Sequence, residues 1–178
     1  MVELDLATWT ALGTWALVIG TIVLMYWQTR KTQELNSANA VITLRERFDS
    51  SRMRKARKDL ATHLLTDSEG DIVSVEVATF LELLGALTHR GVLDDDLVWE
   101  AFGTWITAYY WALRHPVDHI GRTREDLRDP LVFHEFEWLY ERIATLDRRR
   151  LGPGDPSLIP PDAEARKMLR RESTLEVV

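Results

Sequence analysis

Glu82 is the polar residue whose position best suits chemistry. On a helix it shares one side with Ala78, Gly85 and His89, because residues three and four apart lie on one face. A carboxylate near an imidazole can act as a general base, and together with Glu100 it could form a hydrolase or metal-enzyme site. No glycine-rich phosphate loop, nucleophile elbow or cysteine accompanies it. We therefore keep an enzyme as an alternative and expect no cofactor.

The five histidines lack the spacing of metal ligands. His115 and His119 are four apart, but Pro116 between them opposes a regular helix across the pair. The stretch HEFEW at 134 lacks the second histidine of the H-E-x-x-H zinc motif. Helix capping explains the three aspartates at 94–96 without an ion. We predict no metal site.

A structural role for Glu82 is the stronger interpretation. The small residues on its side of the helix suit close approach of a second helix, and a carboxylate held there needs a partner because a buried unpaired charge is strongly unfavourable. Arg57, on the preceding helix, is the cation we expect. The hypothesis is a bidentate ion pair between Arg57 and Glu82 that sets the register of two helices.

The elements that would position these residues are all helices. Between 30 and 150, apolar residues recur at spacings of three and four, and no strand-like alternation occurs. Ser50 is a predicted N-cap, Gly91 a predicted helix stop, and Asp129–Pro130 a predicted helix start. Residues 115–130 are a predicted connector, because Pro116 and Gly121 oppose a long helix. The helix expected over 96–114 is apolar almost all round, which is typical of a central helix. The sequence predicts an all-α bundle of about four to five helices.

Trp111 stands alone on the polar stripe of the 96–114 helix, among Glu100, Thr104 and Arg114. If exposed, such a tryptophan is a candidate anchor for a partner protein. The alternative is that a loop covers it.

The N-terminal segment has the pattern of a membrane-spanning helix. Residues 6–29 form 24 consecutive positions without a charge, and a helix of that length crosses a hydrocarbon layer of roughly 30 Å. Trp9 lies near one end, and Tyr26 and Trp27 near the other, where aromatic rings settle at headgroup depth. The start carries acids and no base, which is unlike a secretion signal. We predict a single N-terminal transmembrane helix.

Orientation follows from Arg30 and Lys31, which come directly after the predicted span. We expect the N-terminus outside, the rest in the cytoplasm, and the whole at the bacterial inner membrane. Gly13, Ala16 and Gly20 share one side of the span, and small residues at such spacing permit close helix packing and homo-oligomers. Ordinary lipid-facing positions are the alternative.

Charge is segregated along the chain, whose net charge is -6. Residues 30–58 hold nine bases against three acids, and 59–138 hold five against sixteen. Anionic lipid is the predicted partner of the basic part, and a solvated helix face is the alternative. Nucleic acid is a weaker interpretation because the cluster contains no stacking aromatic residues. The lipid-proximal candidates are Arg30, Lys31, Arg52, Arg54, Lys55 and Lys58.

The predicted organisation has three parts. Residues 1–29 hold the N-terminal segment and the span, and residues 30–150 hold the basic juxtamembrane helix and the bundle. Residues 151–178 form a linker and tail, because four prolines and two glycines lie within 152–161.

The chain also resembles a family of uncharacterised bacterial membrane-anchored proteins, catalogued as a domain of unknown function. The resemblance covers roughly residues 5–146 and rests on three stretches, LRERFDSSRMRKARKDL, FLELLGALTHRGVLDDDLVWEAFGTWITAYY and FHEFEWLYERI. It implies one N-terminal span and a cytoplasmic helical domain, and it assigns no reaction. We expect a membrane-anchored, non-enzymatic module that binds or scaffolds an unidentified protein; the alternatives are the enzyme above and an oligomeric membrane-complex subunit.

Overall fold

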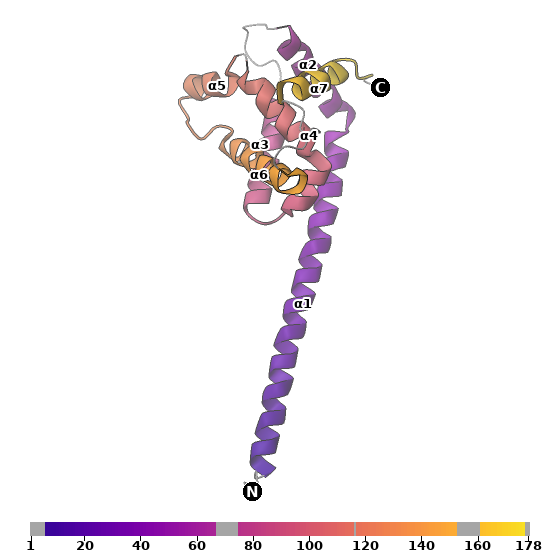
Figure 1. Ribbon diagram of the computed structural model, residues 1–178, viewed down its shortest axis with the longest axis vertical. Helices are drawn as coiled ribbons and strands as arrows, with labels where there is room; N and C mark the ends of the chain where they lie inside the picture. Colours follow the sequence, from indigo (N-terminus) through magenta and orange to yellow (C-terminus); the bar gives the residue numbers. More distant parts are fainter. Residues whose placement is uncertain (1–5, 67–74, 116, 153–160, 177–178) are drawn as a thin grey trace. The chain divides into compact units, whose positions relative to one another are not determined.

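The computed structural model describes residues 6–66, 75–115, 117–152 and 161–176, and the described side chains leave out those of 6–20, 22, 151, 161 and 164 (Figure 1). These residues contain helices and no strand, which confirms the all-α prediction. Two compact units divide the chain, Met1–Ser37 and Ala38–Val178. The helices are α1 (Leu6–Phe48), α2 (Ser51–Leu65), α3 (Glu76–His89), α4 (Asp95–Arg114), α5 (His119–Leu127), α6 (His134–Leu151) and α7 (Pro161–Ser173).

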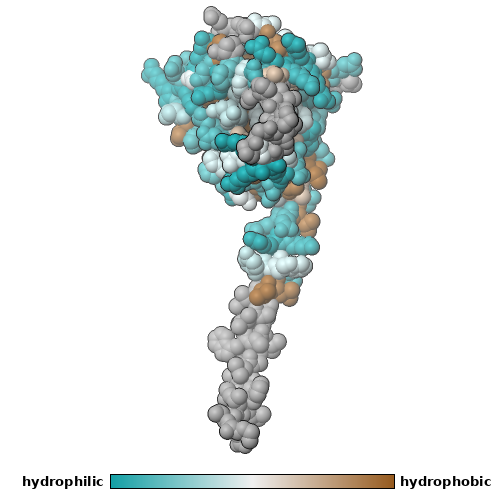
Figure 2. Space-filling model, viewed as in Figure 1, coloured by the Kyte–Doolittle hydropathy of each residue, from teal (hydrophilic) through white to brown (hydrophobic). Residues whose placement is uncertain are grey.

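The first unit contains the N-terminal part of α1. The side chains of Val23–Trp27 are exposed there although all five are large and apolar. The guanidinium of Arg30 lies 5.5 Å from the ring centroid of Tyr26, and Lys31 Nζ lies 5.2 Å from that of Trp27. Figure 2 shows apolar side chains where the described surface of α1 begins and hydrophilic ones further along the helix. The apolar run Val23–Trp27 and the basic residues Arg30 and Lys31 therefore lie close together on the same helix.

The predicted transmembrane helix receives no support from the described part of the chain. Within that part, no helix combines the length and the apolar character needed to cross a membrane. Most side chains of the predicted span, those of 6–20 and 22, lie outside the description. The span, and with it the packing role of Gly13, Ala16 and Gly20, stays a prediction.

The core of the second unit forms around Phe48, the last residue of α1. Its ring lies 5.1 Å from that of Phe80, 5.7 Å from that of Phe102 and 5.6 Å from that of Trp105, measured between centroids. All three phenylalanines are at most 4% exposed. Tilted and edge-to-face aromatic pairs at these distances are favourable beyond the area that they bury. This cluster joins the C-terminal end of α1 to α3 and α4.

The predicted helix ends of α2, α3 and α4 are close to the observed ones. Ser50 caps α2, because its hydroxyl accepts a hydrogen bond of 3.3 Å from the N–H of Met53. Gly91 follows the end of α3 with φ +69°, a left-handed conformation that favours glycine. Asp94 caps α4, because its carboxylate accepts hydrogen bonds from the N–H groups of Asp96 and Leu97. Helices α3, α5, α6 and α7 all pack against α4, which confirms it as the central helix.

The region after α4 differs from the prediction. Residues 119–127 were expected to be a connector, yet they form α5, which Asp118 caps by accepting a 2.9 Å bond from the N–H of Gly121. Asp129 and Pro130 open a turn, and α6 begins only at His134. Proline and glycine therefore mark the ends of short elements here.

The C-terminal segment differs from the predicted domain organisation. Residues 161–173 were assigned to a tail, yet they form α7, which packs on α2 and α4 (Figure 1). Ala165, Met168 and Leu169 on α7 are at most 8% exposed. The physical reason is that an amphipathic helix too weak to fold alone gains stability from packing on the body. Residues 153–160 lie outside the description.

Candidate functional site

Glu82 joins α3 to the N-terminus of α6. Its carboxylate accepts hydrogen bonds of 3.2 Å from the N–H of Glu135 and 2.7 Å from the N–H of Phe136. The first N–H groups of a helix have no partner within it, and the helix dipole favours a negative charge at that end. Glu82 is therefore a helix cap supplied from another element. Phe133, the residue before α6, makes no side-chain cap of its own.

Gly85 allows this contact. A Cβ atom at Gly85 would lie 2.7 Å from the carbonyl carbon of Glu135, a distance that real Cβ atoms essentially never show. The backbone of α6 can approach α3 only because no side chain is present at this position. The small-residue face predicted around Glu82 is thus the face that α6 contacts.

The residues of the enzyme alternative do not meet at one point. His89 Nδ1 lies 2.8 Å from a carboxylate oxygen of Glu135, and the His89 ring stacks on Trp138 with centroids 4.2 Å apart. Glu100 instead lies 3.6 Å from Arg150. Since Glu135 and Arg150 are fifteen residues apart on α6, roughly 22 Å of helix separates the two places. Among the described residues, no three His, Asp or Glu side chains are grouped to hold a metal ion.

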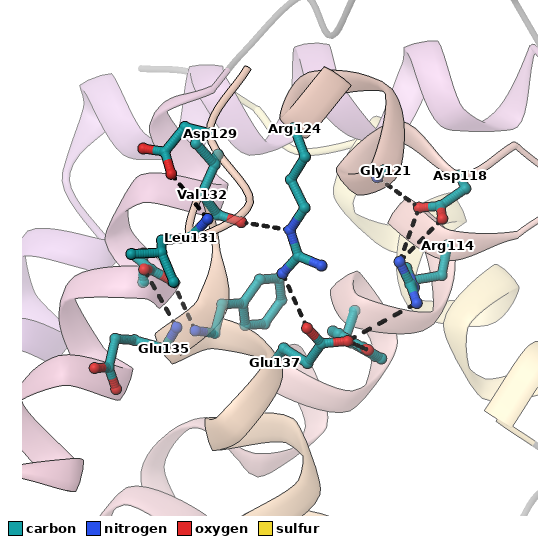
Figure 3. A network of polar contacts seen from close by, with 12 residues as sticks. Arg114, Asp118, Gly121, Arg124, Asp129, Leu131, Val132, Glu135 and Glu137 are labelled. Carbon is teal, nitrogen blue, oxygen red and sulfur yellow. Dashed lines mark hydrogen bonds and ion pairs between the residues drawn. The ribbon is translucent and has the colours of Figure 1, made fainter. Parts of the chain in front are cut away.

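A network of polar contacts surrounds Glu137 on α6 (Figure 3). Arg124 reaches from α5 and donates bonds of 2.9 Å both to the carbonyl of Val132 and to the Glu137 carboxylate. Tyr110 on α4 donates a 3.0 Å bond to the same carboxylate, and Arg114 lies 3.8 Å from it. Burial raises the pKa of Glu137, but the bonds and charges of its partners outweigh that effect and lower it. The network ties α4, α5 and α6 together.

Arg57 has partners other than the predicted one. Arg57 Nε lies 3.3 Å from a carboxylate oxygen of Glu172 on α7, and Nη2 lies 3.8 Å from Asp49. Its guanidinium also lies 4.2 Å from the ring centroid of Phe48. The predicted ion pair between Arg57 and Glu82 was therefore wrong. Glu82 is satisfied by backbone N–H groups, so it does not require a cation.

The buried charges of Arg57 and Glu172 form the most unusual polar centre of the second unit. Their side chains are 4% and 6% exposed. Trp105 Nε1 donates a 3.2 Å bond to Glu172. The hydroxyl of Tyr109 is buried next to these groups without a hydrogen-bond partner among the described residues. Burial first and the charge of Glu172 second raise the pKa of Tyr109, against the smaller opposite effect of Arg57.

The predicted basic residues differ in their contacts and in their exposure. Arg52 donates a 2.6 Å bond to Glu76 on α3, and Lys58 donates a 2.9 Å bond to the carbonyl of Leu175. The bond of the half-buried Lys58 argues against lipid contact at that residue, whereas the ion pair of Arg52 is a surface pair that contributes little to stability. Arg54 is half-buried. The exposed candidates are Arg30, Lys31 and Lys55, together with Arg52, whose side chain is 83% exposed despite its bond to Glu76.

Trp111 is half-buried. It packs against the core, and its ring lies over that of His115 with centroids 5.2 Å apart. The structure therefore fits the alternative of a covered tryptophan better than that of an exposed anchor.

Glu172 is the functional candidate that the sequence analysis missed. On α7 the apolar residues Ala165, Met168 and Leu169 are at positions i, i+3 and i+4, and Glu172 is at i+7. This is the spacing of one helix face. The pattern is visible in the sequence. Because the fourth position of this face is the acidic Glu172, the segment lacks the fourth apolar residue that would have indicated a packed helix.

The fold and these contacts define a helical domain whose buried polar groups link one helix to another. Residues 4–143 match the family described as a domain of unknown function, DUF4760. Since the match covers most of the chain, the protein belongs to this family. No curated protein and no solved structure matches the sequence.

Proposed function

We propose that the chain is a membrane-attached helical module that binds another protein and performs no catalysis. The observation that carries the proposal is the run Val23–Trp27 on α1, where five consecutive large apolar side chains are 54–62% exposed. Successive helix residues are turned by about 100°, so five of them cover the whole circumference. A partner protein would cover only one side of a helix, whereas lipid surrounds a helix completely, so lipid suits this run better.

The sequence around this run supports the same proposal. The run belongs to the 24 uncharged positions at 6–29, and Arg30 and Lys31 follow it. Aromatic and basic residues at such a border are typical of a membrane interface. In this proposal the N-terminus faces outward and the second unit lies on the cytoplasmic side of the bacterial inner membrane.

The non-enzymatic part of the proposal is supported by the contacts of the candidate catalytic residues. Glu82 caps α6, and His89 packs between Glu135 and Trp138. Both side chains thus have a structural role at the contact of α3 and α6. A module with a folded helical body next to a bilayer is suited to holding a partner protein there.

Vesicle flotation tests the membrane attachment. The full chain should float with vesicles that contain anionic lipid, and Val18→Asp with Leu24→Asp should lower the floating fraction at least about tenfold, because each acid is unfavourable in hydrocarbon. The matched control is Leu35→Asp with Ile42→Asp, which places the same acids at residues of α1 that are 60% and 57% exposed and follow the basic pair. A full chain that stays with the soluble fraction, or equal losses in both variants, would contradict the proposal.

A further inference from the structure

The α7 site is the surface of α2 and α4 that α7 covers, with Arg57, Lys58 and Trp105 as its polar partners. Helix α7 presents one continuous stripe to this surface. Its buried positions are Ala165, Met168, Leu169 and Glu172. A carboxylate thus occupies the last position of an otherwise apolar stripe, and the α7 site supplies a buried cation to meet it.

The α7 site and its occupant come from different segments of the chain. The family match at 4–143 contains both α2 and α4, and it ends within α6. Helix α7 follows later, after the proline- and glycine-rich residues 152–160. The contact therefore has the form of a domain that binds an amphipathic helix, a common mode of peptide recognition.

Helix α7 satisfies the polar groups of this surface incompletely. Arg57 Nε and Glu172 Oε2 are 3.3 Å apart, yet neither atom has an aligned hydrogen bond among the described residues. The same holds for the hydroxyl of Tyr109, whose side chain is fully buried. Buried polar atoms without a partner are unfavourable. A helix with a better aligned carboxylate, or one that reached Tyr109, would satisfy these atoms more completely than α7 does.

We propose that the α7 site binds an amphipathic helix of a partner protein, with small and apolar residues at i, i+3 and i+4 and a carboxylate at i+7. Helix α7 fills the site until that partner helix displaces it. This inference names the partner class of the module proposed above and rests on that function. It does not depend on how α1 meets lipid.

A free helix has to compete with α7 for the α7 site, so the binding is measured on a chain in which α7 is weakened. A segment tethered to its own site has an effective concentration on the order of millimolar, so it masks the site from a free helix of similar affinity. Leu169→Asp places a charge in the apolar stripe of α7 and leaves α2 and α4 unchanged. The full-length Leu169→Asp chain should therefore bind a free helix much more tightly than the wild-type chain.

The probe is a fluorescent synthetic peptide with the sequence of residues 161–176, added to the full-length Leu169→Asp chain in detergent micelles. Fluorescence anisotropy should show binding, and Glu172→Gln in the peptide should weaken it at least about thirtyfold, because the buried Arg57 then keeps only its longer 3.8 Å contact with the exposed Asp49. The control peptide carries Glu176→Gln at an exposed position and should bind like the original. A folded chain that binds no peptide, or binds the Glu172→Gln and original peptides equally, overturns the proposal.

A second measurement needs no change to α7 packing. The chain has no cysteine, so Glu176→Cys allows one dye to be attached beside α7. Excess unlabelled peptide should lower the anisotropy of this dye as α7 leaves its site, and an unchanged anisotropy at millimolar peptide overturns the proposal. A dimer in which two copies exchange α7 also overturns it, in favour of a second copy as the occupant. Since both measurements are made in micelles, a failed flotation experiment leaves their outcome interpretable.

Discussion

At the residue scale, Arg57 and Glu172 show how a buried charge pair can specify an arrangement of helices. Transfer of each ion from water costs several kcal/mol, and the attraction between them offsets that cost only when the geometry is good. The 3.3 Å contact lacks an aligned hydrogen bond, so we infer that the pair adds little net stability. Its effect is selective, because a helix without a carboxylate at this position would leave the buried Arg57 with only its 3.8 Å contact to Asp49.

Tyr110 gives a prediction on pH dependence. Burial, the hydrogen bond to Glu137 and the charge of Glu137 raise the pKa of Tyr110 to about 12, against a smaller opposite effect of Arg114. An unfolded tyrosine has a pKa of about 10, so the neutral phenol stabilises the fold fully below pH 10 and loses this effect as the pH rises toward about 12. Glu137→Gln should lower the pKa of Tyr110.

Absorbance of tyrosinate across an alkaline titration measures this pKa. The control variant Tyr110→Phe identifies the transition, because it should remove the step near pH 12. A step that persists in Tyr110→Phe, or does not move in Glu137→Gln, would contradict the assignment of Glu137 as a cause of the raised pKa.

The sequence indicated an ion pair for Arg57 but not the carboxylate that forms it. Glu82 lies on the next helix along the chain, whereas Glu172 lies beyond a proline-rich segment. The choice depends on two facts of three-dimensional structure. Backbone N–H groups at the start of α6 already satisfy Glu82, and α7 returns to cover α2.

At the element scale, the contact of α3 and α6 depends on the absence of a side chain at Gly85. Gly85→Ala should lower the free energy of unfolding by about 2 kcal/mol, because the added methyl group forces the backbone of α6 away from Glu82. Urea denaturation measures the change. Gly103→Ala is the matched control within α4, where the nearest atom to a new Cβ, in Trp99, is 3.6 Å away.

That control should raise the free energy of unfolding by up to about 1 kcal/mol, because alanine favours a helix more than glycine does. Equal effects of the two substitutions would show that α6 does not approach α3 as closely as described.

The helices with strong periodicity were predictable, and the weakly apolar ones were not. Helices α2 and α4 follow from their caps and apolar faces, which local sequence encodes. Helix α5 was missed because Pro116 and Gly121 suggested a loop, although the proline precedes the helix and the glycine lies in its first turn. The packing of α7 on the body was not predicted, because the segment has too few apolar residues to fold alone and tertiary contacts stabilise it.

At the scale of the whole molecule, the chain separates a helix with exposed apolar residues from a body with a buried core. The first unit, Met1–Ser37, contains the apolar run and the basic pair that follows it. The second unit, Ala38–Val178, extends further than the predicted bundle because it includes α7. In Figure 2 the visible face of that unit is mainly hydrophilic. Membrane attachment by α1 would leave such a surface in water.

Cysteine labelling in whole bacterial cells tests this central claim most directly. The chain has no cysteine, so Glu3→Cys and Thr104→Cys each place one thiol, the second at an exposed position of α4. A membrane-impermeant thiol reagent should label the cysteine at position 3 in intact cells and the one at 104 only after lysis, with both variants in the membrane fraction. Labelling at 104 in intact cells, or recovery of the chain in the soluble fraction, would contradict the account.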